Sequence, residues 1–273
     1  MSVVLSGEDM RAALTIAGSD PSGGAGIQAD LKTFQAHGVF GMSAVTAVTV
    51  QNTRKVYDVQ EIDPDIVQAQ ILRVFEDITV DVVKIGMVSS IALIDSIADA
   101  LGRVRLPPVV LDPVMISKSG YSLLRAEART ALVERLFPLA EIVTPNIHEA
   151  ELLAGFTIRT VPDMEAAARH MVAAGAAKAV IKGGHLAGEA AVDLAYDGAR
   201  CETVTAPRMD SRNTHGTGCT FSSAVAANRA RGAAFFPAVA AAKQYITEAI
   251  RQAPDLGHGA GPLNHMVAVP DPL

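Results

Sequence analysis

Short runs of β-branched and other apolar residues alternate along most of the chain with longer segments whose apolar residues recur at helical spacing. The short runs predict buried strands over residues 13–17, 43–50, 82–85, 109–112, 142–144 and 179–182. The longer segments predict helices over residues 26–37, 64–77, 91–101, 126–136, 146–153 and 164–174, with Asp63 and Asp163 as N-caps of the second and the last. Repeated strand–helix units predict a mostly parallel sheet covered by helices on both faces.

The pattern changes in the last third of the chain. Strands are predicted over residues 190–196 and 201–205, on either side of Asp197 and Gly198, a dipeptide that favours a hairpin turn. Helices are predicted over residues 218–230 and 236–251. The hairpin predicts an antiparallel edge to the sheet. Because no linker or repeat divides the chain, we expect one domain over residues 1–273, with loose termini over 1–10 and 266–273 and a tail that loosens from residue 261.

Composition narrows the class of protein. The chain has 273 residues, of which 49% are hydrophobic, enough for a large core without a metal or disulfide staple. Its 29 acidic residues outnumber the 23 basic ones and no Lys/Arg cluster stands out, so we expect no nucleic-acid partner. Residues 1–11 lack the apolar core of a signal peptide, and no apolar run reaches the ~18 residues of a membrane span. Cys201 and Cys219 form no CxxC pair, which favours the reduced cytoplasm.

Polar and glycine-rich segments follow the predicted strands, at the sheet edge where α/β proteins bind ligands. Residues 18–26 are rich in glycine, and their amides can bind an anion or a polar ligand, unless they form only a flexible connection. Gln51 carries a neutral amide that could pair with the edge of an aminopyrimidine ring, or lie in solvent. Met87 could pack against an aromatic ring, although a core methionine is the commoner case.

Charged residues follow the later strands. Asp112 and Glu149 are acids of the type that hold Mg²⁺ through water and substrate phosphates, although Glu149 could simply favour the start of a helix. Lys182 leaves a strand beside two glycines and could contact a phosphate, or mark an ordinary turn.

The segment over residues 213–221 is the most specific of these features. Gly216 and Gly218 precede a long helix that begins near Cys219, and free amides at a helix start form an anion-binding site. We expect a cysteine there to have a lowered pKa. A small buried cysteine at a helix start is the structural alternative.

Together these segments resemble the ribokinase-like superfamily, and more narrowly the hydroxymethylpyrimidine and phosphomethylpyrimidine kinases. The resemblance rests on motifs that occur in the family's order and together cover about residues 12–265. These motifs lie at residues 17–34, 50–53, 84–87, 110–115, 144–146, 182–185, 213–220 and 257–262. The resemblance implies a three-layer α/β/α sandwich with a mostly parallel central sheet, and a homodimer.

The resemblance also implies an ATP- and Mg²⁺-dependent kinase of thiamine biosynthesis. Such an enzyme phosphorylates 4-amino-5-hydroxymethyl-2-methylpyrimidine and then its monophosphate, a small-molecule substrate. In this sequence Gln51 would pair with the pyrimidine edge and Met87 would pack on its ring. The residues implied around them are Ala25, Asp30, Thr49 and Val114.

The remaining roles implied by the resemblance concern the nucleotide and the metal. Asp112 and Glu149 would support Mg²⁺. Lys182 would contact an ATP phosphate. The residues implied with Lys182 on the nucleotide are Asn146, Thr214 and His215. The catalytic anion hole would consist of Gly216, Thr217, Gly218 and Cys219.

Cys219 departs from the superfamily's sugar kinases, which carry an aspartate base at this place. Cysteine there is similar to the pyrimidine kinases and some bacterial pyridoxal kinases, and it leaves open whether Cys219 takes the hydroxyl proton. A mobile flap over the phosphates is a further hypothesis, for residues 117–121.

Three alternatives remain open at this stage. A vitamin B6 kinase, or a dual-activity enzyme, would place a pyridine in the same pocket, where an apolar residue would suit the ring better than Gln51. A cysteine-dependent hydrolase would use Cys219 as the nucleophile, with His185 or His215 as its base. A non-catalytic binding module would have no need to keep Asp112, Glu149, Lys182 and Cys219 together.

Overall fold

The computed structural model describes residues 10–117, 120–184, 186, 188 and 190–272. Lys118 and Ser119 of the expected flap, His185, and nearly all of the expected loose N-terminus lie outside the described residues.

In the described part of the chain, nine strands form one sheet in the order β3-β2-β1-β4-β5-β6-β7-β8-β9. Six of these strands run parallel to one another, and β3, β8 and β9 pair antiparallel with their neighbours. The strands are β1 (Ala12–Ser19), β2 (Phe40–Gln51), β3 (Val56–Glu61), β4 (Val82–Ile85), β5 (Val109–Leu111), β6 (Ile142–Val143), β7 (Lys178–Ile181), β8 (Ala190–Tyr196) and β9 (Cys201–Pro207). The mostly parallel sheet with an antiparallel hairpin at its edge is therefore confirmed.

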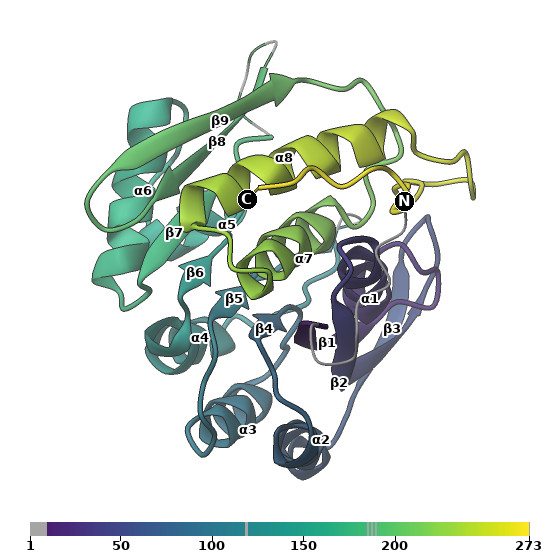
Figure 1. Cartoon of the computed structure of the whole chain (residues 1–273), viewed down its shortest axis with the longest axis vertical. Helices are drawn as coiled ribbons and strands as arrows, with labels where there is room; N and C mark the ends of the chain where they lie inside the picture. Colours follow the sequence, from purple (N-terminus) through teal and green to yellow (C-terminus); the bar gives the residue numbers. More distant parts are fainter. Residues whose placement is uncertain (1–9, 118–119, 185, 187, 189, 273) are drawn as a thin grey trace.

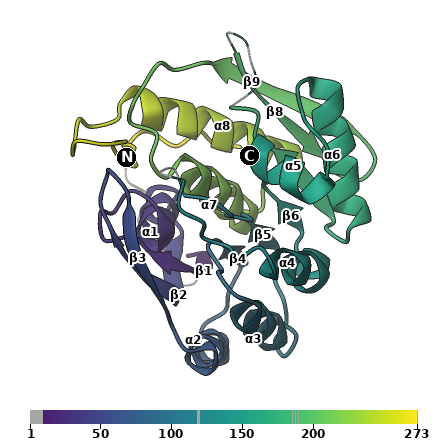
Figure 2. The ribbon, with the colours of Figure 1, turned by 180° about the vertical axis from the view of Figure 1, so that it is seen from behind.

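Helices cover both faces of this sheet. Figure 1 shows α7 and α8 in front of it, and Figure 2, seen from behind, brings α4, α5 and α6 forward. The helices are α1 (Gly26–Ala36), α2 (Pro64–Asp77), α3 (Ile91–Leu101), α4 (Ala128–Leu136), α5 (Ile147–Ala154), α6 (Val161–Ala173), α7 (Thr217–Ala230) and α8 (Phe235–Arg251), with a short 3₁₀ turn, η1 (Phe137–Leu139).

Strand alternation divides the core between the two faces. Along β1, Leu14 and Ile16 join the cluster that includes α2 to α6, whereas Ala13 joins the cluster built on α7 and α8. Successive side chains of a strand point to opposite faces, so the buried central strands need apolar residues at every position. The three-layer α/β/α sandwich follows from this pattern.

Strand β3 was not expected from the sequence. It pairs antiparallel with β2 and forms the second edge of the sheet. Its exposed positions include Tyr57, Asp58 and Gln60, and only Val56 is buried, so no continuous apolar run marked it. Edge strands need few apolar residues, which is why this one resembles a loop in sequence.

Helix starts agree in part with the sequence. Asp63 caps α2 as expected, its side chain accepting from the Asp65 amide at 2.9 Å. Asp163 is not the N-cap of α6. Thr160 caps that helix, and Asp163 is its reciprocal partner three residues on, accepting from the Thr160 amide at 2.9 Å. The helix consequently starts three residues before the predicted position.

The expected loose tail is wrong for residues 261–269. Leu263, His265 and Val267 are buried on the α7–α8 face, and the Tyr245 hydroxyl of α8 donates to the His265 carbonyl at 2.8 Å. In Figure 1 this yellow segment runs beside α8 toward the C-terminus. Its alternating apolar residues fill space beside the helices, so the segment belongs to the core.

Within the described ranges, no helix combines the length and hydropathy needed to span a lipid bilayer.

Candidate active site

A cavity of about 820 Å³ opens beyond the carboxyl ends of the central strands, where α1, α5 and α7 begin. This volume suits a small molecule together with a nucleotide. Every residue implied for the kinase site by the sequence lines the cavity except Asp30. The lining members of that set are Ala25, Thr49, Gln51, Met87, Asp112, Val114, Asn146, Glu149, Lys182, Thr214, His215, Gly216, Thr217, Gly218 and Cys219.

The glycine-rich loop after β1 is held by a buried carboxylate. Asp20 is 3% exposed and accepts hydrogen bonds from the Ser22 amide at 2.9 Å, the Ser22 hydroxyl at 2.7 Å and the Ala25 amide at 2.9 Å. Nε2 of His215 lies 2.8 Å from the same Asp20 oxygen that accepts from the Ala25 amide. Burial alone would raise the pKa of Asp20, but the hydrogen bonds from His215 and Ser22 lower it below the usual value. Asp20 is therefore an anion that joins this loop to the segment before α7.

The start of α7 has the geometry expected of an anion-binding site. Its N-cap, Gly216, has φ +81°, and a Cβ there would lie 1.8 Å from the Gly24 carbonyl oxygen. Only glycine fits that position, because it lacks the Cβ and tolerates positive φ. The first-turn amides of a helix have no intrahelical partner, so those of Gly218 and Cys219 are available to a phosphate. The Thr217 amide instead donates to the Thr214 carbonyl at 3.4 Å.

Cys219 does not have the lowered pKa that its position suggested. Burial raises the pKa of its thiol to about 11, against the opposing influence of Lys84 and of a hydrogen bond from the Gly26 amide. The expectation considered the helix start alone. Removal of water from around the sulfur outweighs it.

Two buried carboxylates and a lysine meet beside the helix start. The Lys182 ammonium lies 2.6 Å from one oxygen of Asp112, and a Cβ on Gly218 would lie 3.3 Å from that ammonium. Burial would lower the pKa of Lys182, but Asp112 and Glu149 raise it above its usual value. Lys182 thus remains charged at the mouth of the anion site.

Glu149 combines the expected place at a helix start with a place in the cavity lining. It forms a capping box with Asn146, accepting from the Asn146 amide at 2.8 Å, and it also lines the cavity. Burial raises its pKa to about 7, although Lys182 opposes the rise. A structural role at the start of α5 and a place in the site are therefore compatible.

Asp30 lies beneath the cavity and does not line it. It is fully buried and forms an ion pair with Lys84, whose ammonium lies 2.9 and 3.0 Å from its two oxygens. The hydroxyls of Thr15 and Ser223 donate to Asp30 at 2.6 and 2.7 Å. Lys84 does line the cavity. Because all of these partners lie inside the protein, the role of Asp30 in the structure is to support Lys84.

Sequence reasoning missed Asp20 and Lys84 as parts of the site. Lys84 had a usable signal, because a lysine inside the apolar strand Val82–Ile85 requires a buried carboxylate. Asp20 lay in a motif already singled out, but nothing in sequence shows which distant group it accepts from.

Gln51, Thr49 and Met87 form one end of the cavity. The Thr49 hydroxyl donates to the Ser19 carbonyl at 3.0 Å and lies 3.2 Å from the side-chain oxygen of Gln51. The Met87 sulfur lies close to Gly18, where a Cβ would be 3.0 Å from it. This end offers a neutral amide and a polarisable surface, which suit a flat heterocycle.

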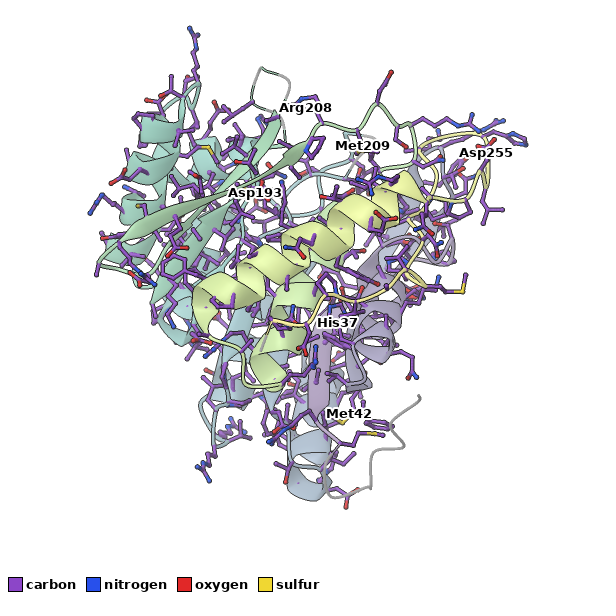
Figure 3. The ribbon with its side chains drawn as sticks, turned by 45° about the horizontal axis from the view of Figure 1, so that its top comes forward. His37, Met42, Asp193, Arg208, Met209 and Asp255 are labelled. Carbon is purple, nitrogen blue, oxygen red and sulfur yellow. The ribbon has the colours of Figure 1, made fainter. Side chains whose placement is uncertain are left out.

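The other end of the cavity was not expected from the sequence. Asp193 on β8 pairs with Lys243 on α8 at 2.8 Å, and the surrounding lining is apolar. Figure 3 shows Asp193 on β8, with Arg208 and Met209 following β9. The apolar lining residues are Ala191, Ala206, Pro207, Met209, Ile246 and Ile250.

This fold and this site define a kinase of the ribokinase-like class, with an anion-binding helix start, a charged lysine and two carboxylates at the carboxyl edge of the sheet. A family profile described as phosphomethylpyrimidine kinase matches residues 20–264, and the chain belongs to that family.

Individual relatives agree. The chain is 50% identical to the hydroxymethylpyrimidine/phosphomethylpyrimidine kinase of Rhizobium meliloti, over 93% of this chain and 96% of that protein. It is also 50% identical to the thiamine biosynthesis bifunctional protein ThiED of Geobacter sulfurreducens, over 94% of this chain, but it spans only 53% of that longer protein.

Two solved structures are similar along most of their length. Phosphomethylpyrimidine kinase from Clostridium difficile 630 has a TM-score of 0.78 and 47% identity, covering 88% of this chain and 99% of that one. The ADP complex of Bacillus subtilis pyridoxal kinase has a TM-score of 0.86 and 44% identity, covering 94% and 97%.

Proposed function

We propose that this chain is an ATP-dependent kinase that phosphorylates the hydroxymethyl group of 4-amino-5-hydroxymethyl-2-methylpyrimidine and then phosphorylates the monophosphate to the diphosphate, in thiamine biosynthesis. The observation that carries the proposal is a single cavity that joins Gln51 and Met87 to the helix start at Gly216 and to Lys182. Family membership and relatives named for this activity support it.

Substrate recognition follows from the two ends of the cavity. Gln51 pairs with the amino group and ring nitrogen of the pyrimidine, and Met87 packs on the ring. Ala25, Thr49 and Val114 complete this end. At the other end the apolar lining near Lys243 receives the nucleotide, with Asn146 and Thr214 in the lining between the two ends. His215 was expected on the nucleotide, but its ring lies against Asp20 and Gln51 at the substrate end. That the Bacillus subtilis relative was crystallised with ADP supports ATP as the phosphoryl donor.

Phosphoryl transfer needs positioning and charge stabilisation more than covalent chemistry. The substrate hydroxyl oxygen attacks the γ-phosphorus, the bond from that phosphorus to the bridging oxygen breaks, and ADP leaves. The amides of Gly218 and Cys219 and the Lys182 ammonium stabilise the charge on the transferred group. Removal of one such donor costs about 10²–10³ in rate in comparable sites.

Asp112 and Glu149 suit the Mg²⁺ that this chemistry uses. No cluster of three or more candidate ligands occurs in the described portion of the chain, and Mg²⁺ is commonly held by one or two carboxylates together with water and phosphate oxygens. When bound, the ion neutralises charge on the phosphates. The two carboxylates stay in place through Thr144 and Lys182 on Asp112 and the Asn146 amide on Glu149.

We place Cys219 as the acceptor of the hydroxymethyl proton. With a pKa of about 11, the thiol is protonated at neutral pH in the free enzyme. A required thiolate would therefore make kcat/KM rise about tenfold per pH unit between pH 8 and 10. This window lies above the raised pKa of Glu149, which is about 7.

Two variants test this role. Cys219→Asp restores an ionised base and should flatten the profile. Near-normal turnover of Cys219→Ala, or a flat profile in the unmodified enzyme, would rule the role out and leave Cys219 as part of the anion hole.

The proposed activity is tested by ADP release with Mg-ATP and each candidate acceptor. The acceptors are the hydroxymethylpyrimidine, its monophosphate, pyridoxine and pyridoxal, with a no-acceptor control. Release with both pyrimidines and little with the B6 vitamers is expected.

A B6 kinase is the second candidate, favoured by the 44% identity to the Bacillus subtilis pyridoxal kinase. Release with pyridoxal but not with the pyrimidine monophosphate would establish that function in place of the first. The hydrolase alternative has lost its support, because the chain belongs to a kinase family.

We further propose a cytoplasmic homodimer. Both cysteines are free thiols, which supports a reducing compartment. Light scattering coupled to size exclusion tests the assembly, and a mass of one chain would refute it.

A further inference from the structure

Four side chains at the substrate end of the cavity form a continuous polar chain. Nε2 of His215 lies 2.8 Å from Asp20 and 3.2 Å from the side-chain nitrogen of Gln51. The side-chain oxygen of Gln51 lies 3.2 Å from the Thr49 hydroxyl. The hydrogen atoms that these groups carry decide which of these contacts are real hydrogen bonds.

Asp20 determines which ring nitrogen of His215 carries the hydrogen. The carboxylate of Asp20 already accepts from Ser22 and Ala25, and its pKa is lowered, so it has no proton to donate. Nε2 of His215 must therefore carry the hydrogen of the 2.8 Å bond. A ring nitrogen that carries a hydrogen cannot accept one from the Gln51 amide nitrogen.

Thr49 gives the same result independently. Its hydroxyl has one hydrogen, which it donates to the Ser19 carbonyl at 3.0 Å. Toward Gln51 it can only accept, so it needs a nitrogen opposite and not an oxygen. Amide oxygen and nitrogen are assigned from the hydrogen-bond network, and a half-turn of the amide resolves both conflicts. The Nε2 hydrogen is then shared between the Asp20 oxygen at 2.8 Å and the Gln51 oxygen at 3.2 Å, and the Gln51 nitrogen donates to Thr49.

We propose that the Asp20–His215 pair holds the Gln51 amide with its oxygen toward His215 and its nitrogen toward Thr49, and so sets the donor and acceptor pattern that the site presents to the substrate ring. In this orientation the amide keeps one acceptor and one donor position free of these partners. They match an amino group beside a ring nitrogen, the edge of an aminopyrimidine. A pyridine that has a carbon in place of this ring nitrogen cannot accept a hydrogen bond from the Gln51 amide. The inference rests on the proposed function and names the source of its ring specificity.

The surrounding packing keeps the imidazole in place. His215 is 8% exposed, and its amide donates to the Gly261 carbonyl at 3.1 Å. A Cβ on Gly24 would lie 2.5 Å from the ring carbon Cδ2, so the glycine-rich loop leaves only enough space for this ring position. His215 is thus a positioning residue, since it acts on the substrate through Gln51.

The tautomer can be measured without any substrate. In protein labelled with ¹⁵N-histidine, the His215 resonances are assigned by their loss in His215→Leu. We expect Nε2 to carry a hydrogen. A ring protonated only at Nδ1 would overturn the inference, whatever the enzyme's activity.

Coupled kinetics test the consequence for specificity. We expect His215→Leu and Gln51→Leu each to raise the KM for hydroxymethylpyrimidine about tenfold or more, with the ATP KM changed less than about twofold. The double variant should be no worse than the poorer single variant, because the residues act as one unit. The preference for the pyrimidine over pyridoxal should fall in all three variants.

Gln70→Leu is the matched control. Gln70 bonds the backbone of Val45 outside the cavity, so its loss should leave both KM values unchanged. If the enzyme phosphorylates the pyrimidine but the KM increase of the double variant equals the product of the two single increases, His215 does not act through Gln51. An unmodified enzyme that fails to phosphorylate the pyrimidine would instead refute the proposed function.

Discussion

Removal of the buried lysine beneath the cavity should destabilise the protein strongly. Lys84 and Asp30 are both fully buried, and the ammonium lies 2.9 and 3.0 Å from the two carboxylate oxygens. Lys84→Met keeps a flexible chain of similar length but removes the charge, which leaves the Asp30 anion with only the hydroxyls of Thr15 and Ser223. Loss of one partner of a buried ion pair costs about 3–5 kcal/mol.

This loss corresponds to a fall of about two to three and a half powers of ten in the folding equilibrium constant. Burial would lower the pKa of Lys84, but Asp30 raises it well above its usual value, so the substitution removes a cation at neutral pH. Addition of Asp30→Asn to Lys84→Met should recover at least half of the lost stability, because a neutral amide needs no cation and can still accept from the two hydroxyls.

Urea unfolding followed by circular dichroism measures these differences by linear extrapolation. Arg11→Met is the matched control, since it removes a cation from the exposed pair with Asp81 and should cost no more than about 1 kcal/mol. Stability of Lys84→Met within about 1 kcal/mol of the unmodified protein, or a double variant less stable than Lys84→Met alone, would refute the reasoning.

Three further predictions concern other parts of the molecule. Gly216→Ala should abolish activity and destabilise the protein by more than about 2 kcal/mol, because its Cβ would lie 1.8 Å from the Gly24 carbonyl oxygen. Gly38 also has a positive φ but lies in open space, so Gly38→Ala should cost only about 1 kcal/mol. Equal losses of stability in urea unfolding would contradict this prediction. His37 is buried with a pKa lowered from 6.5 to about 4, so the unfolding free energy should fall by about 3 kcal/mol as pH drops from 6.5 to 4. His37→Gln should remove this part of the pH dependence of the unfolding free energy. An unchanged pH dependence in the variant would be inconsistent with a buried neutral ring. Burial raises the pKa of Cys219 from 9.0 to about 11, so iodoacetamide at pH 8 should alkylate it at least about 100-fold more slowly in the folded protein than in urea. Peptide mass spectrometry measures the two rates. Equal rates would disprove the raised pKa.

The regular elements were predictable where local signals agree. The helix over 64–77 has helical periodicity, a capping aspartate and a proline at its first position, and the structure has the same bounds. The helix over 164–174 was misplaced at its start because two acceptors, Thr160 and Asp163, compete for one cap. Strand β3 was missed because it is stabilised by pairing with β2, and its own sequence gives no sign of that pairing.

The site was predictable to the same degree. Residues that follow parallel strands gather at one edge, so Gln51, Met87, Asp112 and Lys182 were found from their order along the chain. Asp30 belonged to the same motifs, yet its α1 position directs it into the ion pair below the cavity.

The sequence by itself determined the α/β alternation, the glycine-marked start of α7, and the family, because periodicity, glycine positions and motif order are local properties of the chain. Only the tertiary structure decided that Asp20 reaches His215 across 195 positions, that Lys84 neutralises Asp30, and that Cys219 is a protonated thiol in the free enzyme. These outcomes depend on burial and on charges brought together from distant segments, and the free energy of a charge is set by its surroundings in space, not by its neighbours along the chain.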